Sequence, residues 1–299
     1  MRIVNLAGGL GNQMFQYAFA LMLKNHYPDE EVLVDTQHYN TIFFKKFRSV
    51  NLHNGYEIGS LFANAPLRIA TVGELSRLTY YIPNYVLSRV ARRLLPIRET
   101  EYVAAGDMHF TYDQGIFREC DTYYEGYWQY AGYYIDMRKQ LQQVFQPPKS
   151  NDYNRRMIDR IEGCNSVGIH VRRGDYKDAP EFNGICTTDY YKKAIHHIIS
   201  GGENPTFFIF SNDMEWCKAN MQQLVGPHDI VFVDQNKGSQ SCWDMFLMTH
   251  CRQLIIANST FSWWGAFLND HAETVCAPSP WVRQDGKVEV LDPQWIAIK

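Results

Sequence analysis

Two adjacent arginines follow an apolar run in the segment GIHVRRGDY, residues 168–176. Because successive side chains of a strand point to opposite faces, Arg172 and Arg173 cannot both pack against the same neighbour. A guanidinium stays charged, offers a planar fork of donors and is less strongly hydrated than an ammonium, so it can hold phosphate oxygens in a partly dry cleft. The pair therefore predicts a diphosphate-binding site. In the alternative interpretation, one arginine pairs with Asp175 or Asp178 and only fixes the loop.

Polar residues also follow three further predicted strands, at 206–211, 229–234 and 253–258. They are Ser211, Asn212 and Asp213 after the first, Asp234, Gln235 and Asn236 after the second, and Asn258, Ser259 and Thr260 after the third. In an open α/β sheet, ligands bind outside the carboxyl ends of the strands. Together with the arginines, these clusters predict one pocket at one edge of a sheet.

Two of these clusters directly precede predicted helices. Asp213 could accept hydrogen bonds from guanine N1 and N2, or it could merely favour the helix dipole, with Ser211 or Asn212 as the cap. In ANSTFSWWGAF, the polar residues exceed the needs of one N-cap, and free N–H groups at a helix N-terminus suit a phosphate. The residues predicted to face the phosphates are Asn258, Ser259, Thr260 and Ser262.

The segment GGLGNQ, residues 8–13, follows the predicted strand 2–6 and precedes a helical pattern. Met14 takes the place of the third glycine of a dinucleotide-binding fingerprint, which disfavours an NAD-dependent oxidoreductase. The glycines let the backbone approach a ligand closely, and the amides of Asn12 and Gln13 can both donate to and accept from sugar hydroxyls. Alternatively, Asn12 is a simple N-cap.

Strands rich in β-branched and aromatic residues alternate with helices through the second half of the chain, which is typical of a parallel sheet covered on both faces. Thr188 is predicted to cap the first of these helices. A strand–helix–strand unit also opens the chain, whereas residues 40–135 are predicted as mixed helix and loop. The segment QPPKSND, 146–152, is the best linker. We therefore predict an α/β protein with two domains, residues 1–150 and 151–299.

The composition excludes some functions. With 29 basic and 32 acidic residues and a net charge of -3, the chain lacks the positive field of a nucleic-acid binder. Its 7 cysteines form no CxxC pair, which favours reduced thiols in a cytosolic protein, and no signal peptide or membrane span is visible. Residues 76–98 mix apolar residues with arginines, which predicts a surface helix or, alternatively, peripheral contact with an anionic membrane at its inner face.

Four motifs in the order of the chain resemble the inverting α-1,2-fucosyltransferases of glycosyltransferase family 11. They are GGLGNQMFQYA at 8–18, HVRRGD at 170–175, FSND at 210–213 and NSTFSWWGAF at 258–267. The HxRRxD element alone is less specific, because α-1,6- and protein O-fucosyltransferases share it. The resemblance implies a GT-B-like fold, in which two Rossmann-like domains face each other across a cleft. Residues 1–150 would form the acceptor-side domain, and residues 151–299 would bind GDP-fucose.

The resemblance also implies roles for single residues. Arg172 would grip the β-phosphate, with His170 and Arg173 nearby, and Asp213 would meet guanine. Asn12 would lie near the transferred sugar. The other phosphate-side residues would be Ser259, Thr260 and Ser262, and the acceptor-side residues would be Gln13 and Phe15.

The implied reaction moves L-fucose from GDP-β-L-fucose to the 2-hydroxyl of a β-galactoside with inversion, on an oligosaccharide or a lipid-linked glycan. It needs no cofactor and no metal ion, and the sequence has no DxD pattern to carry Mg²⁺. We predict Asp175 as the base, although it could instead orient an arginine, and Asp178 and Glu181 lie in the same loop. The alternatives are fucose transfer with another regiochemistry and a non-catalytic module that binds nucleotide sugars or glycans.

Overall fold

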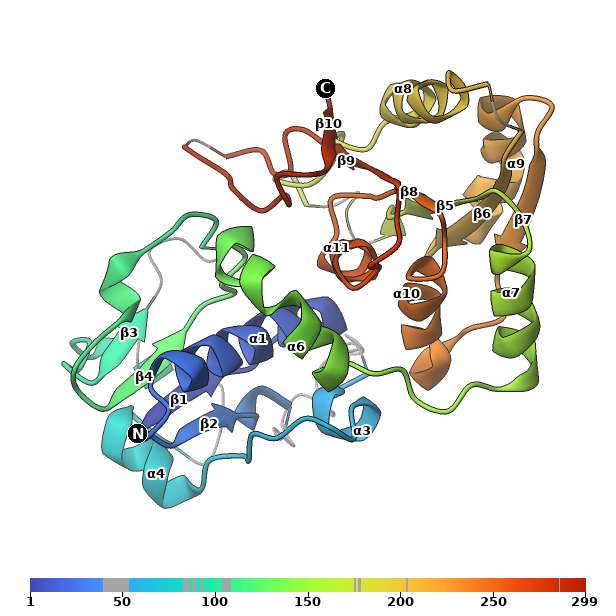
Figure 1. The fold of residues 1–299 in the computed structure, drawn as a ribbon. Helices are drawn as coiled ribbons and strands as arrows, with labels where there is room; N and C mark the ends of the chain where they lie inside the picture. Colours follow the sequence, from blue (N-terminus) through green and yellow to red (C-terminus); the bar gives the residue numbers. More distant parts are fainter. Residues whose placement is uncertain are drawn as a thin grey trace. The chain divides into compact units, whose positions relative to one another are not determined.

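The computed structural model describes residues 1–39, 54–82, 87, 90–91, 94–103, 109–174, 176, 179–202, 204–284 and 286–299. The chain forms two compact units, Met1–Gln146 and Pro147–Lys299 (Figure 1). We call them unit 1 and unit 2. The boundary expected from the sequence, after residue 150, lies a few residues further along the chain. Each unit has its own parallel sheet.

Unit 1 is built on a four-stranded sheet in the order β2-β1-β4-β3. Its strands are β1 (Arg2–Asn5), β2 (Val32–Asp35), β3 (Glu101–Val103) and β4 (Thr122–Glu125). Helix α1 (Leu10–His26) connects β1 to β2 and packs against both. The other helices of its described part are α3 (Ile58–Leu61), α4 (Val72–Leu78) and α6 (Arg138–Val144), and 3₁₀ turns occur at Gln37–Tyr39, Gln114–Ile116, Ala131–Tyr133 and Ile135–Met137.

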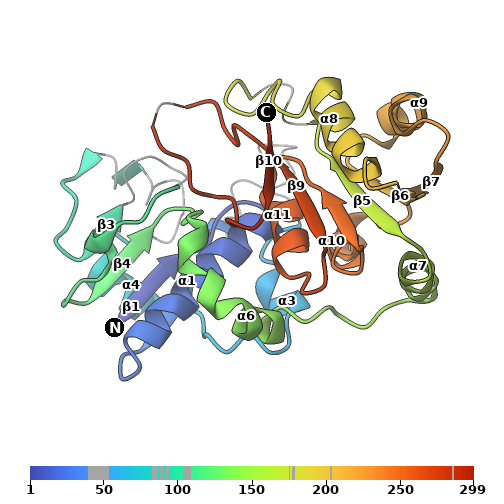
Figure 2. The same cartoon turned by 45° about the horizontal axis from the view of Figure 1, so that its top comes forward.

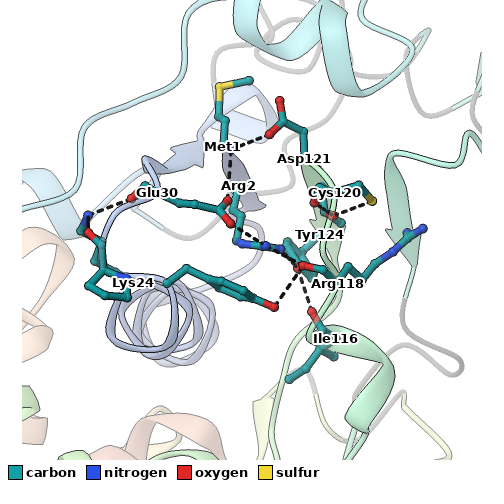
Figure 3. A network of polar contacts seen from close by, with 12 residues as sticks. Met1, Arg2, Lys24, Glu30, Ile116, Arg118, Cys120, Asp121 and Tyr124 are labelled. Atoms are coloured by element: carbon teal, nitrogen blue, oxygen red, sulfur yellow. Dashed lines mark hydrogen bonds and ion pairs between the residues drawn. The ribbon is translucent and has the colours of Figure 1, made fainter.

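The fully buried side chain of Arg2 fastens β1 to its surroundings (Figure 3). Its guanidinium donates to the hydroxyl of Tyr124 on β4 and to the carboxylate of Glu30 just before β2, at 2.9 Å each. The amino group of Met1 pairs with Glu30 as well, at 3.2 Å, and with Asp121 at 2.6 Å. Because a buried charge is tolerated only when it is paired and hydrogen-bonded, this cluster holds β1 between its two neighbours.

Unit 2 contains a six-stranded parallel sheet in the order β10-β9-β8-β5-β6-β7. Its strands are β5 (Ser166–Val171), β6 (Thr206–Ser211), β7 (Asp229–Val233), β8 (Gln253–Ile255), β9 (Thr274–Pro278) and β10 (Ile296–Ile298). Its helices in the described part are α7 (Asp152–Glu162), α8 (Thr188–Ile199), α9 (Met214–Val225), α10 (Cys242–Met248) and α11 (Thr260–Phe267), with a 3₁₀ turn at Gly238–Gln240.

Helices cover both faces of this second sheet (Figures 1 and 2). Helices α8 and α9 pack on one face, where they enclose an apolar core with Val167, Ile169 and Val171 of β5. Helices α10 and α11 lie on the other face. Since side chains alternate along a strand, His170 points to the face that carries α11. Accordingly, its ring lies 5.8 Å from that of Phe261 between centroids.

Most predicted elements of unit 2 are confirmed, and β6 and α9 have the predicted bounds. The prediction of helix and loop for residues 40–135 is wrong for β3 and β4, and the sequence does not predict β10. Helix α1 begins at Leu10, so Asn12 lies within the helix, and Gly9 rather than Asn12 is its N-cap. Thr187, one residue before the predicted Thr188, caps α8 through a hydrogen bond from Tyr190 N–H.

Candidate functional site

The strand order of unit 2 reverses at β5. From β5 the chain continues to β6 and β7 on one side, and it returns to β8, β9 and β10 on the other. Ligands of open α/β sheets bind in the crevice that such a reversal creates outside the carboxyl ends of the strands. Arg172 directly follows β5, and the polar run beginning at Asn258 lies just beyond β8. The two predicted phosphate-binding segments therefore lie at the switch point of the sheet.

Arg173 is held by residues that follow the neighbouring strand β6. Its Nε donates to the carboxylate of Asp213 at 3.2 Å, and its guanidinium carbon lies 4.1 Å from the centroid of the Trp216 ring. Asp213 also caps α9 by accepting from Trp216 N–H at 3.3 Å, so the predicted caps Ser211 and Asn212 are wrong. One arginine of the pair, Arg173, thus has a structural partner, as in the alternative interpretation, but the partner seen in the described residues is Asp213. Asp175 and Asp178 lie outside the described residues.

A neighbouring side chain explains why the residue after the arginine pair, Gly174, is a glycine. The side-chain oxygen of Asn212 accepts a hydrogen bond from Arg173 N–H at 3.0 Å. A Cβ on residue 174 would overlap the amide nitrogen of the same Asn212 side chain. The glycine therefore lets the ends of β5 and β6 approach each other closely.

Arg172 lies beside the ring of Tyr176. It is half-buried, and its guanidinium carbon lies 5.3 Å from the centroid of the Tyr176 ring. The Tyr176 hydroxyl donates to the main-chain oxygen of Asn258 at 3.2 Å, so this ring joins the ends of β5 and β8. No sequence motif singled out Tyr176. The feature that could have identified it as part of the site is its position directly after the charged motif.

His170 is buried and uncharged at neutral pH. Loss of hydration and, to a lesser extent, the positive charge of Arg172 together lower the pKa of its imidazole to about 3. Its exposed fraction is 4%, and its Nδ1 atom is buried and has no hydrogen-bond partner among the described residues. Because buried polar atoms are normally satisfied, this nitrogen is suited to a hydrogen bond with a ligand or an ordered water.

The polar residues that follow β8 have two kinds of role: some side chains hydrogen-bond within the protein, and others do not cap the helix that they precede. The amide of Asn258 donates to the main-chain oxygens of Trp281 and Phe182 and accepts from Cys186, and the Ser262 hydroxyl donates to main-chain oxygens at 3.2 and 3.3 Å. Ser259 is the N-cap of α11 but makes no side-chain cap, and Thr260 is half-buried. In the part of the chain that the structure describes, no side chain caps the first N–H groups of α11, which suits them to a ligand.

The polar cluster after β7 belongs to a separate network. Asp234 pairs with Lys218 at 2.7 Å, whereas Asn236 exchanges hydrogen bonds with Asn154 of α7 and donates to Asp244 of α10 at 2.9 Å. Strand β7 also lies at the edge of the sheet. The prediction of one pocket from all of the clusters is therefore wrong for this one.

The predicted acceptor-side residues lie in unit 1. Gln13 is fully buried, donates to the main-chain oxygens of Gly8 and Gly55, and accepts from Glu57 N–H at 2.8 Å. Phe15 is also fully buried and packs its ring edge-on against Tyr134. These packing roles disfavour the predicted acceptor contact for both. Asn12 is partly exposed in the first turn of α1.

The described residues contain neither a cluster of metal-ligating side chains nor a helix that could span a membrane. No group of three or more His, Cys, Asp or Glu side chains there is placed to hold a metal ion, and metal independence stays a prediction because Asp175 and Asp178 are not described. In the same part of the chain, no helix has both the length and the apolar character needed to cross a bilayer.

Comparison with known proteins identifies the class of enzyme. The chain is 29% identical over 306 residues to an alpha-1,2-colitosyltransferase of Escherichia coli, which covers 99% of this chain and 98% of that protein. It is 34% identical to galactoside alpha-(1,2)-fucosyltransferase 1 of Ateles belzebuth over 105 residues, which are 34% of this chain and 28% of that protein.

The fold is similar to that of a solved fucosyltransferase. The NodZ alpha-1,6-fucosyltransferase of Bradyrhizobium, soaked with GDP-fucose, matches with a TM-score of 0.50 and 14% identity over 92% of this chain and 93% of that chain. This likeness confirms the predicted α/β fold of the GT-B class. The family model described as Glycosyl transferase family 11 matches residues 90–299, which is more than half of the chain. The protein is therefore a glycosyltransferase and belongs to glycosyltransferase family 11.

Proposed function

We propose that the protein transfers L-fucose from GDP-β-L-fucose to the 2-hydroxyl of a terminal β-galactoside, with inversion and without a metal ion. The observation that carries the proposal is the position of Arg172 and the open N-terminus of α11 at one switch point, in a chain of family 11. Both features attract phosphate oxygens, one by a guanidinium and the other by free N–H groups.

The donor site uses these two features for catalysis. Arg172 stabilises the charge that develops on the diphosphate as its bond to the anomeric carbon breaks, and the N–H groups of α11, with Ser259 and Thr260, bind the remaining oxygens. His170 supplies one hydrogen bond without charge. Asp213 already accepts from Arg173 and Trp216, so a contact with guanine uses the remaining lone pairs of its carboxylate. Asn258 and Ser262 hold α11 in place.

Inversion follows from a single displacement. The acceptor hydroxyl oxygen forms its bond to the anomeric carbon on the face opposite the diphosphate, and GDP leaves with the electron pair of the broken bond. The hydroxyl proton passes to a base, for which we propose Asp175. General-base assistance contributes about 10² to 10⁴ in rate. An Asp175→Asn variant that loses less than this range would exclude the assignment.

Product analysis tests the proposed reaction. Purified protein is incubated with GDP-fucose and a panel that includes lactose, N-acetyllactosamine and a lipid-linked galactoside, and the linkage of any product is determined by NMR. An α-1,2 linkage supports the proposal, and another linkage supports the alternative regiochemistry. GDP binding without turnover on any acceptor would instead identify a non-catalytic binding module.

A second candidate is transfer of colitose, because one of the relatives that align over nearly the whole chain is an alpha-1,2-colitosyltransferase. Colitose is fucose without its 3-hydroxyl. A site built to bind a hydroxyl rejects the analogue that lacks it by about 10⁴ to 10⁵, whereas a site without that contact accepts both sugars. The kcat/KM values for GDP-fucose and GDP-colitose, measured on one acceptor, decide between the two donors.

Unit 1 is also proposed to contact an anionic membrane from the cytoplasmic side. The exposed large apolar residues of the described part all fall within residues 69–112; they are Ile69, Val72, Leu87, Val90, Leu94, Leu95, Ile97, Val103 and Tyr112. Arginines occur in the same stretch, and such a combination favours anionic lipid surfaces. We expect flotation with phosphatidylglycerol vesicles but not with phosphatidylcholine vesicles, and less flotation for Leu94→Gln. Absence of flotation with either lipid would contradict the contact.

A further inference from the structure

The turn that follows β4 contains an unusual backbone. Trp128 is fully buried and has a φ of 54°, in the left-handed region that bulky residues rarely adopt. Such strain persists only where the surroundings hold it, and it often marks a functional position. Here the Trp128 ring stacks on Phe19 at 4.0 Å between centroids, and its main-chain oxygen accepts a hydrogen bond from Tyr134.

The strained turn places the next residue, Gln129, against the side chain of Asn12. Gln129 has an exposed fraction of 3%, and its Nε2 donates to Asn12 Oδ1 at 3.2 Å. Gly8 lies close to the nitrogen of the same amide: its φ is 83°, and a Cβ on this residue would lie 2.8 Å from Asn12 Nδ2. Two unusual backbone positions, in different segments of unit 1, thus accommodate one amide group.

This contact fixes which end of the Asn12 amide is available. Its oxygen is engaged by Gln129, whereas its nitrogen donates to no protein atom in the part of the chain that the structure describes. Asn12 follows β1, at which the strand order of the first sheet reverses between β2 and β4. The donor end of the amide therefore lies at the edge where ligands of such sheets bind.

We infer that Gln129 is a positioning residue of the transferase: it holds Asn12 so that the amide N–H groups donate to an oxygen of a bound sugar. The inference rests on the proposed function. It adds a residue that none of the sequence motifs contains.

A double-mutant cycle tests this role. Gln129→Met keeps the size of the side chain but removes the hydrogen bond to Asn12, and we expect kcat to fall about tenfold to a hundredfold, as for other misplaced catalytic groups, with an unchanged KM for the donor. In an Asn12→Ala background, Gln129→Met should cause no further loss, because residues that act as a unit are not additive. Gln129→Glu should also lower kcat, since Asn12 would turn its amide nitrogen toward the new carboxylate.

Gln140→Met is the matched control, because Gln140 forms a similar amide pair with Asn25 in unit 1, away from the carboxyl edge of the sheet. It should keep wild-type kcat. Equal losses from Gln129→Met in the wild-type and Asn12→Ala backgrounds would overturn the inference, as would wild-type kcat in Gln129→Glu. Thermal unfolding identifies a variant that fails to fold, in which case Gln129→Glu carries the test. If the wild-type protein itself transfers no sugar, it is the proposed function that fails.

Discussion

At the scale of single residues, the two neighbouring arginines have different surroundings. Arg173 is engaged by the carboxylate of Asp213 and by the face of Trp216, both of which follow β6. Arg172 lies over the ring of Tyr176, whose hydroxyl donates to the main-chain oxygen of Asn258 beyond β8. The chain thus uses one arginine to join β5 to β6, and it directs the other to the switch point of the sheet.

We therefore expect the two arginines to differ when they are replaced. Arg172→Ala should lower kcat/KM by about 10² to 10³, the loss found when one group that stabilises a developing charge is removed. Arg172→Lys should recover little, because an ammonium lacks the planar fork. Steady-state kinetics and thermal unfolding of both variants check this. Near-wild-type turnover of a folded Arg172→Ala protein would contradict the donor-site assignment.

Gly174 allows a second test at this scale. In Gly174→Ala, the new methyl group displaces the Asn212 side chain and breaks its hydrogen bond to Arg173 N–H, so we expect a loss of about 1 to 2 kcal/mol in unfolding free energy and weaker GDP binding. Gly201→Ala is the control, because its methyl group would meet only one atom, at an ordinary 3.8 Å. Denaturant unfolding and calorimetric titration with GDP should separate the two variants. Equal behaviour of both would refute the packing argument.

At the scale of elements, the sequence predicts what local patterns determine. Strand β6 and helix α9 have their predicted bounds because an apolar run and a helical pattern meet at a polar cap. Strands β3 and β10 are three residues long and depend on distant partners. Side-chain roles that depend on distant partners cannot be predicted for the same reason. The amide of Asn258 donates to the main-chain oxygens of Phe182 and Trp281, which no local spacing indicates. The positions of Arg172 and of the start of α11 near the carboxyl edge of the sheet could be predicted, because the first directly follows β5 and the second comes shortly after β8.

The contact between α7 and α10 depends on a carboxyl group with an unusual pKa. Loss of hydration and the negative charge of Asp234, partly offset by the hydrogen bond from Asn236, together raise the pKa of Asp244 from 3.8 to about 7. The folded protein therefore binds more protons than the unfolded chain between these two values. It follows that the free energy of unfolding falls as the pH rises through this window, and this contribution is lost above it.

Asp244→Asn should remove this pH dependence. We expect the variant to be more stable than the wild type at about pH 8, by about 1 to 4 kcal/mol, and to have no such advantage at about pH 4. Denaturant midpoints across this range provide the measurement, with the exposed Asp29→Asn as a control for the loss of a surface charge. A stability difference that does not change with pH would show that Asp244 does not titrate in this window.

At the scale of the whole molecule, the net charge of -3 means that the chain as a whole repels a nucleotide sugar weakly. Attraction for the diphosphate must therefore come from local groups, for which we propose Arg172 and the N-terminus of α11 in unit 2. A mobile divalent cation could supply the same charge in principle, so the proposed mechanism makes a definite prediction. After treatment with EDTA and dialysis, turnover should remain unchanged, because the guanidinium cannot be removed by a chelator.

The Arg172→Ala variant provides the contrast, since added Mg²⁺ should raise its residual rate by shielding the diphosphate that has lost its arginine. A wild-type enzyme that loses its activity with EDTA and regains it with Mg²⁺ would transfer the role of stabilising the leaving group from the arginine to a metal ion.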